Sequence, residues 1–114
     1  MAIKNIGDED FKSVVNEGSG YVLVDFWAPW CKPCVALSSI LEDISQKYSN
    51  TLSIVKMNID DNPSVPSAHR VKSIPTLILF FNGKELESHI GFADFASLTN
   101  WLDKLMQSSK DTEL

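Results

Sequence analysis

Apolar residues gather in segments along the chain, and three of these segments have the composition of strands. Tyr21–Trp27 is a nearly continuous apolar run, typical of a strand buried on both faces. Leu52–Asn58 and Thr76–Phe81 are also rich in apolar and β-branched residues. Asn82-Gly83 directly follows the third segment and is a strong hairpin signal, so Leu86–Ile90 is predicted to return as an antiparallel strand. One further edge strand is predicted over Ala2–Ile6.

Between these strands the apolar residues recur at helical spacing. Asp8 is predicted to be the N-cap of a first helix, which ends at Gly18. A second helix of about four turns is predicted from Cys34 onward, and Asn62-Pro63 fits an N-cap followed by proline at the start of a short third helix. The apolar positions of the first, second and last helices are Phe11, Val14 and Val15, then Leu37, Ile40, Leu41, Ile44 and Tyr48, then Phe95, Leu98, Leu102 and Leu105.

The predicted order of elements is β-α-β-α-β-α-β-β-α. Strands that alternate with helices indicate parallel pairing, and the hairpin adds an antiparallel edge. The sequence therefore predicts an α/β fold with a central mixed sheet of four to five strands and about four helices on its two faces. No repeat or linker divides the chain, so residues 1–107 are expected to form one domain and residues 108–114 a short tail.

The composition and net charge of the chain indicate which classes of molecule it is unsuited to bind. The 114 residues are 44% hydrophobic and 22% charged, as in an ordinary globular domain. The net charge of −5 disfavours binding to nucleic acid or to anionic lipid. No apolar stretch approaches the roughly 20 residues that a membrane helix needs. Because residues 1–6 do not resemble a signal peptide, a cytoplasmic protein is expected.

The only two cysteines, Cys31 and Cys34, lie close together in the sequence. A disulfide between them would close almost no loop and would constrain the unfolded chain very little. The pair is therefore better explained by reactivity or by metal binding than by a structural role. A zinc site would usually need a second pair or nearby histidines. His69 and His89 are distant in sequence, and we expect them at surface or half-buried positions.

The pair is placed where a buried strand turns into a helix. Cys31 is predicted at the helix N-terminus, where free amide groups and the helix dipole favour a thiolate. A thiolate is the attacking species in disulfide exchange. Cys34, one turn further along and facing the core, is expected to remain protonated until it resolves the mixed disulfide.

Asp25 interrupts the buried strand with a carboxyl group. A buried carboxylate is costly unless it is paired or used, and burial raises its pKa. Asp25 is therefore a candidate to relay a proton from Cys34. In the alternative interpretation, Asp25 forms a plain salt bridge with Lys56.

Several motifs together resemble the thioredoxin family in order and spacing. They are Val24-Asp25-Phe26, Trp27-Ala28-Pro29-Trp30-Cys31-Lys32-Pro33-Cys34, Lys56-Met57-Asn58-Ile59-Asp60, Ile74-Pro75-Thr76 and Asn82-Gly83, and the similarity covers about residues 3–107. The resemblance implies the thioredoxin fold and general reduction of protein disulfides through a redox-active Cys31–Cys34 pair. It also implies an electron carrier that binds no cofactor or metal. An NADPH-dependent thioredoxin reductase would recycle it.

The resemblance also assigns residues to the site. Asp25 corresponds to the family's buried acid and Lys56 to its lysine partner. Pro75 corresponds to a cis proline that faces the disulfide, and the backbone of Ile74 would pair with an extended substrate. Trp30, Ile74, Gly91 and Phe92 would form an apolar rim around Cys31, and Lys32 and Pro33 complete the motif between the cysteines. Trp27 is assigned mainly to packing beneath the site.

Four positions depart from the common family pattern. Lys32 stands where the commonest motif has glycine, and Ser39 replaces a proline that kinks the second helix. Phe92 is bulkier than the usual small residue after Gly91, and His69 replaces a frequent tyrosine. Lys32 and Phe92 bear on the potential of the pair and on the choice of partners.

Three classes of function are compatible with these features. The leading hypothesis is a monomeric dithiol reductase that acts on disulfides in client proteins. An oxidant or isomerase would usually have a signal peptide and a different dipeptide between the cysteines. A binding module, in which the reduced fold serves as a subunit of another complex, stays open.

Overall fold

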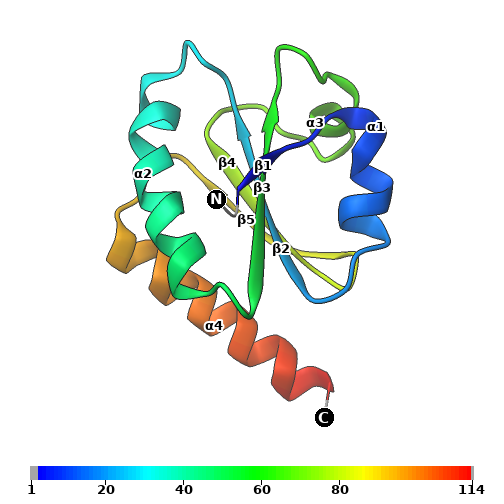
Figure 1. The fold of residues 1–114 in the computed structure, drawn as a ribbon, viewed down its shortest axis with the longest axis vertical. Coiled ribbons are helices and arrows are strands. Elements are labelled where there is room, and N and C mark those ends of the chain that lie inside the picture. Colours follow the sequence, from blue (N-terminus) through cyan, green and yellow to red (C-terminus); the bar gives the residue numbers. More distant parts are fainter. Residues whose placement is uncertain (1–2, 114) are drawn as a thin grey trace.

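Five strands form one mixed sheet in the order β1-β3-β2-β4-β5 (Figure 1). The computed structural model describes residues 3–113. The β1, β3 and β2 strands are parallel, whereas β4 is antiparallel to both β2 and β5. The strands are β1 (Lys4–Asn5), β2 (Tyr21–Trp27), β3 (Leu52–Asn58), β4 (Thr76–Phe81) and β5 (Lys84–Ile90). The predicted α/β fold with a mixed central sheet is confirmed.

Helices cover both faces of this sheet. Figure 1 shows α2 and α4 on one face and α1 and α3 on the other. The helices are α1 (Asp8–Phe11), which passes directly into a π-helical turn, η1 (Lys12–Asn16), then α2 (Lys32–Lys47), α3 (Ser64–Ala68) and α4 (Phe95–Glu113). None of the helices in the described part of the chain has the length and apolar character needed to cross a membrane.

Successive side chains of β2 and β4 point to opposite faces of the sheet, and this divides the core into two layers. Leu23 and Leu79 face α2 and α4, whereas Val24 and Phe80 face α1 and η1. All four are at most 1% exposed, because β2 and β4 lie in the interior of the sheet. The buried side chains of the first layer include Leu37, Leu41, Ile44, Leu98 and Leu102, and those of the second include Phe11, Val15, Val55, Met57 and Ile78.

The structure corrects several predicted boundaries. The edge strand is only Lys4–Asn5, and residue 2 of its predicted range lies outside the described residues. The α2 helix begins at Lys32, two residues before Cys34, and α4 continues to Glu113. The predicted range for the last strand also began too late, since β5 starts at Lys84. Val14 is 37% exposed, although its spacing predicted a core position.

Both predicted N-caps are wrong by one position. Gly7 caps α1, and Pro63 is the N-cap of α3. The side chains of Asp8 and Asn62 instead cross between the two helices. The Asp8 carboxylate accepts hydrogen bonds from the backbone amides of Ser64 and Val65, and Asn62 Oδ1 accepts one from the amide of Asp8. Each side chain therefore satisfies amide groups at the start of the other helix.

Candidate active site

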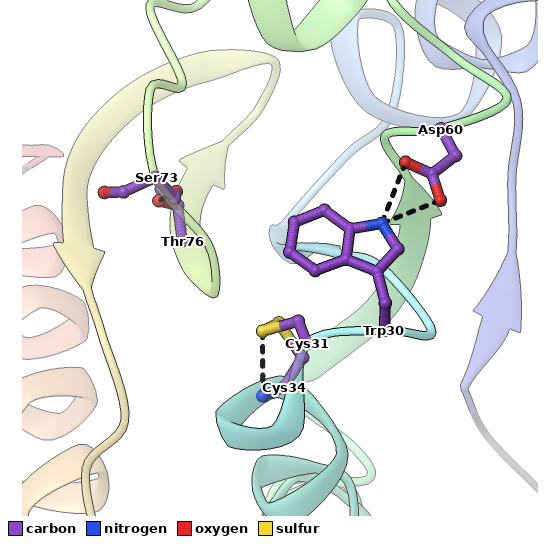
Figure 2. Close-up of a disulfide and its surroundings, with 6 residues drawn as sticks. All are labelled: Trp30, Cys31, Cys34, Asp60, Ser73 and Thr76. Carbon is purple, nitrogen blue, oxygen red and sulfur yellow. Dashed lines mark hydrogen bonds between the residues drawn. A yellow bond between two sulfur atoms is a disulfide. The ribbon is translucent and has the colours of Figure 1, made fainter.

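Cys31 and Cys34 lie at the junction between β2 and α2, as predicted. Cys31 is the N-cap of α2, with extended backbone angles, and Pro33 lies in the first turn, where a missing amide hydrogen costs nothing. The two cysteines form a disulfide with their Cα atoms 5.2 Å apart. The backbone amide of Cys34 donates a hydrogen bond to Cys31 Sγ at 3.2 Å (Figure 2). A free helix-terminal amide thus points at the sulfur that would carry negative charge after reduction.

Both cysteines of the disulfide are largely buried. Cys31 is 5% exposed and Cys34 is 2% exposed. Both pack with the fully buried Ala28, and Trp27, Ile59 and Ile74 line the same cluster. Cys34 therefore faces the interior, as its place in the first turn of α2 predicts.

Asp25 is buried on β2, on the same face of the sheet as Leu23 and α2. It is 1% exposed, and neither carboxyl oxygen receives a hydrogen bond from the described residues. Burial raises the pKa of Asp25 from 3.8 to about 7, and the positive charge of Lys56 opposes part of that rise. A carboxyl group with this pKa changes charge near neutral pH, as a proton acceptor for a thiol requires.

Lys56 lies directly opposite Asp25 in the parallel pairing of β2 with β3. Its ammonium group lies 4.2 Å from the centroid of the Trp27 ring, in cation–π geometry. No ion pair within 4.0 Å joins Asp25 to a cation in the described part of the chain. The contact of Lys56 with Trp27 could not be anticipated, because the two residues are far apart in sequence.

The loop before β4 faces the disulfide. The Ile74–Pro75 peptide bond is cis, as the resemblance implies. The backbone amide of Gly91 donates to the carbonyl of Pro75 at 2.8 Å, and the Thr76 hydroxyl donates to the carbonyl of Ser73. Figure 2 shows Ser73 and Thr76 across from the disulfide. The first bond ties the loop to the end of β5, and the second joins the loop to the start of β4.

Trp30 stands beside Cys31 and is 67% exposed. Its indole Nε1 donates to both carboxylate oxygens of Asp60, at 3.2 and 3.0 Å (Figure 2). This contact orients the ring at the edge of an open groove. The groove has a volume of about 320 Å³ and is lined by Trp30, Ile59, Pro66, Val71, Lys72, Ser73 and Ile74. Asp60 belongs to one of the motifs that resemble the family, but the sequence gives no signal that it would bind Trp30.

The remaining predicted site residues are exposed or partly exposed. Phe92 is 49% exposed, and Ile74 and Gly91 are partly exposed. Lys32, the first residue of α2, is exposed.

Both histidines lie away from the cysteines and are partly buried, in line with the prediction. His69 Nδ1 lies 2.9 Å from Glu85 Oε1, and the ring of His89 packs edge-on against Trp101. Within residues 3–113, no three His, Cys, Asp or Glu side chains are grouped so that they could hold a metal ion.

Comparison with known proteins gives consistent matches over most of the chain. The thioredoxin family model matches residues 2–104. Thioredoxin from Rickettsia felis is 44% identical over 100 residues, which cover 88% of this chain and 95% of that protein. Thioredoxin 1 from Synechococcus elongatus is 44% identical over 99 residues, covering 87% and 92% of the two chains. Thioredoxin from Griffithsia pacifica is 38% identical over 109 residues, covering 96% and 100%.

Proposed function

The chain belongs to the thioredoxin family, and we propose that Cys31 and Cys34 have distinct roles in its dithiol–disulfide exchange. The family needs no bound cofactor, because the cysteine pair is itself the redox group. The observation that carries the proposal is a disulfide at the N-cap of α2, the helix that follows β2, and β2 carries the buried carboxyl group of Asp25.

In the first step, the Cys31 thiolate attacks one sulfur of a client disulfide. A mixed disulfide forms between Cys31 and the client, and the other client sulfur leaves as a thiolate, which takes up a proton from water. The position of Cys31 at the N-cap supports this assignment, since the amide of Cys34 stabilises negative charge on its sulfur.

In the second step, Cys34 resolves the mixed disulfide. Asp25 accepts the thiol proton of Cys34, whose sulfur then attacks Cys31 Sγ. The Cys31–Cys34 disulfide forms, and the second client sulfur leaves and is protonated. Two electrons have then passed from the protein to the client, and each of the two client sulfurs has gained a proton. The burial of Asp25 and Cys34 on the α2 side of the sheet supports this role.

Client segments bind in an extended conformation across the disulfide. The backbone of Ile74 pairs with the client, next to Pro75, while Trp30, Gly91 and Phe92 contact its side chains. The groove beside Trp30 and the exposure of Phe92 support this proposal.

Thioredoxin reductase, using NADPH, returns the pair to the dithiol form. The protein acts as a monomer, and the cytoplasm is its proposed location because thiols are kept reduced there.

Insulin reduction in the presence of dithiothreitol tests the proposed chemistry. The unmodified protein is expected to precipitate the insulin B chain far faster than dithiothreitol alone, and Cys31→Ser is expected to lie at the background rate. A background rate for the unmodified protein would instead support a pure binding module. The reduction potential of the pair, equilibrated with glutathione, separates a reductant from an oxidant.

Cys34→Ser tests the order of attack, because this variant keeps the nucleophile and lacks the resolving thiol. It is expected to accumulate a covalent complex with a disulfide client, visible by mass spectrometry and reversed by dithiothreitol. Normal turnover by Cys34→Ser, or accumulation by Cys31→Ser in its place, would contradict the assigned roles.

A further inference from the structure

Lys56 can reach two different partners on the neighbouring strand β2. It lies directly opposite Asp25 in the parallel pairing of β2 with β3. Because alternate residues of a strand point to the same face of the sheet, Trp27 stands on the same face as Asp25. Lys56 and Trp27 are both partly buried. The long lysine side chain could therefore place its charge against the carboxyl group or against the indole ring.

The indole ring is the partner that Lys56 has in the structure. Its ammonium group lies 4.2 Å from the centroid of the Trp27 ring. Neither oxygen of Asp25 receives a hydrogen bond from the described residues, and no ion pair among them includes Asp25. Tryptophan is the aromatic side chain that attracts a cation most strongly, whereas an ion pair with Asp25 would require both charges to lose water. The ring therefore competes with the carboxyl group for the ammonium.

Packing beneath the disulfide holds the ring in place. Trp27 packs against Ala28, Cys31 and Cys34. Its Nε1 is buried and has no hydrogen-bond partner among the described residues. Since no hydrogen bond orients the indole, its position depends on these apolar contacts. The cysteine pair and Lys56 thus share one aromatic side chain.

Among the described residues, Lys56 is the charged group that acts on Asp25. Burial raises the pKa of Asp25 to about 7, and the charge of Lys56 opposes part of that rise. Leu77, opposite Asp25 on β4, carries no charge. On α2 the cysteines are joined in the disulfide, and the partly buried Glu42 lies about 12 Å along the helix from Cys34. The position of the Lys56 ammonium therefore decides how readily Asp25 ionises.

We propose that Trp27 is a positioning residue for the resolving step, because its ring holds the Lys56 ammonium out of hydrogen-bond contact with Asp25. The proposal rests on the reductase function proposed above, in which Asp25 accepts the proton of Cys34. Without the ring, the ammonium would move to the carboxylate and form an ion pair with it. A cation in contact lowers the pKa of an Asp by about 1–3. Asp25 would then be a weaker proton acceptor, and its working range would move to lower pH.

Titration of Asp25 in the oxidised protein is the first test. The carboxyl carbon is followed by ¹³C nuclear magnetic resonance from pH 4 to pH 9, in the disulfide form so that the cysteines do not titrate. In Trp27→Leu we expect the midpoint to fall by about 1–2 pH units, because the ammonium gains contact with the carboxylate. In Trp27→Phe, which keeps a smaller aromatic face, it should fall less. The pH at which resolution of a mixed disulfide reaches half its maximal rate should fall by the same amounts.

The double variant Trp27→Leu/Lys56→Met separates positioning from packing. It has no ammonium to move, so its midpoint should equal that of Lys56→Met alone. If Trp27 acted only by burying Asp25, loss of the ring would move the midpoint equally with and without the lysine. Ile59→Ala is the control, since it removes another side chain that packs against the two cysteines, and it should leave the midpoint unchanged.

The contact of Lys56 with the ring can also be measured without a substitution. The ring current of Trp27 should shift the ε-methylene protons of Lys56 upfield in the unmodified protein, relative to those of the exposed Lys104. Unshifted Lys56 protons would overturn the proposal, even if Trp27→Leu failed to fold.

The outcomes distinguish this proposal from the reductase function. If the unmodified protein does not reduce insulin, the reductase function fails, whereas the titrations still decide whether Trp27 holds Lys56 away from Asp25. If the Asp25 midpoint is the same in Trp27→Leu as in the unmodified protein, or falls as far when Lys56 is already Met, the positioning role of Trp27 is wrong and the reductase function stands.

Discussion

At the scale of single residues, the buried carboxyl group of Asp25 lowers the stability of the fold and is also the proposed proton acceptor for Cys34. A carboxyl group that is 1% exposed and receives no hydrogen bond from the described residues would destabilise the folded protein when ionised. The sequence predicted this burial, because Asp25 interrupts an apolar strand. It could not predict that the Lys56 ammonium would lie over the Trp27 ring, since such a contact depends on the register of β2 with β3.

Asp25→Asn is expected to raise the free energy of unfolding by an amount that grows with pH. Burial raises the pKa of Asp25 from 3.8 to about 7, so between these values the folded state retains a proton that the unfolded state has released. The gain should be close to zero below pH 4 and reach roughly 4 kcal/mol above pH 7, because each unit of difference between the folded and unfolded pKa corresponds to about 1.36 kcal/mol. Urea denaturation of the oxidised proteins at pH 4, 6 and 8 measures it.

The same substitution should slow the resolution of the mixed disulfide at pH 7 to 8, where the Asp25 carboxylate accepts the proton of Cys34. Asp43→Asn, which removes an exposed acid from α2, is the control and should change neither stability nor rate appreciably. A gain in stability that is equal at all three pH values would show that ionisation of Asp25 is not its source.

At the scale of elements, apolar content located the interior strands better than the edges. β2, β3 and β4 have the predicted bounds, because their side chains are mostly buried. The predicted range for β5 began two residues late, since Lys84 and Glu85 are exposed and give no apolar signal. The turn is only Asn82-Gly83, both with positive φ, so pairing resumes at Lys84.

The helix caps show a second limit of local sequence signals. Asp8 and Asn62 are typical capping residues, and each stands beside a helix start. The fold brings the two helix starts together, and each side chain then bonds to amides of the other helix. Both side chains therefore do accept hydrogen bonds from amides at a helix start, but tertiary contacts decide which helix each of them caps.

Asp8→Ala is expected to lower the free energy of unfolding by about 0.5–2 kcal/mol, as for the loss of an N-cap. The amides that lose their hydrogen-bond acceptor in this variant belong to α3. Hydrogen exchange should therefore quicken at Ser64 and Val65, whereas a cap on its own helix would have protected amides of α1. Glu9→Ala, which removes the neighbouring exposed acid, is the control. Faster exchange confined to α1 would contradict the crossed arrangement.

At the scale of the whole molecule, the site depends on a sheet that both core layers share. The β2 strand ends at the turn that carries Cys31, and β4 begins at the loop that carries Pro75. The resemblance to the thioredoxin family implied that these segments would meet. The resemblance implied an apolar rim that includes Trp30 and Ile74, but it did not indicate that Pro66 and Val71 would extend this rim into a groove, because exposure of an apolar residue is not evident from its place in a sequence.

Since β2 and β4 contribute side chains to both layers, we expect the layers to unfold together. Leu41→Ala in the α2–α4 layer and Phe80→Ala in the α1–η1 layer should each lower the free energy of unfolding by about 2–5 kcal/mol, because both side chains are at most 1% exposed. Urea denaturation followed by tryptophan fluorescence and by far-ultraviolet circular dichroism should give one coincident transition for each variant. Tryptophan fluorescence reports on the site through Trp27 and Trp30 and on α4 through Trp101. If Phe80→Ala separated the two signals while Leu41→Ala did not, the α1–η1 layer would be an independent unit, and the disulfide site could persist without it.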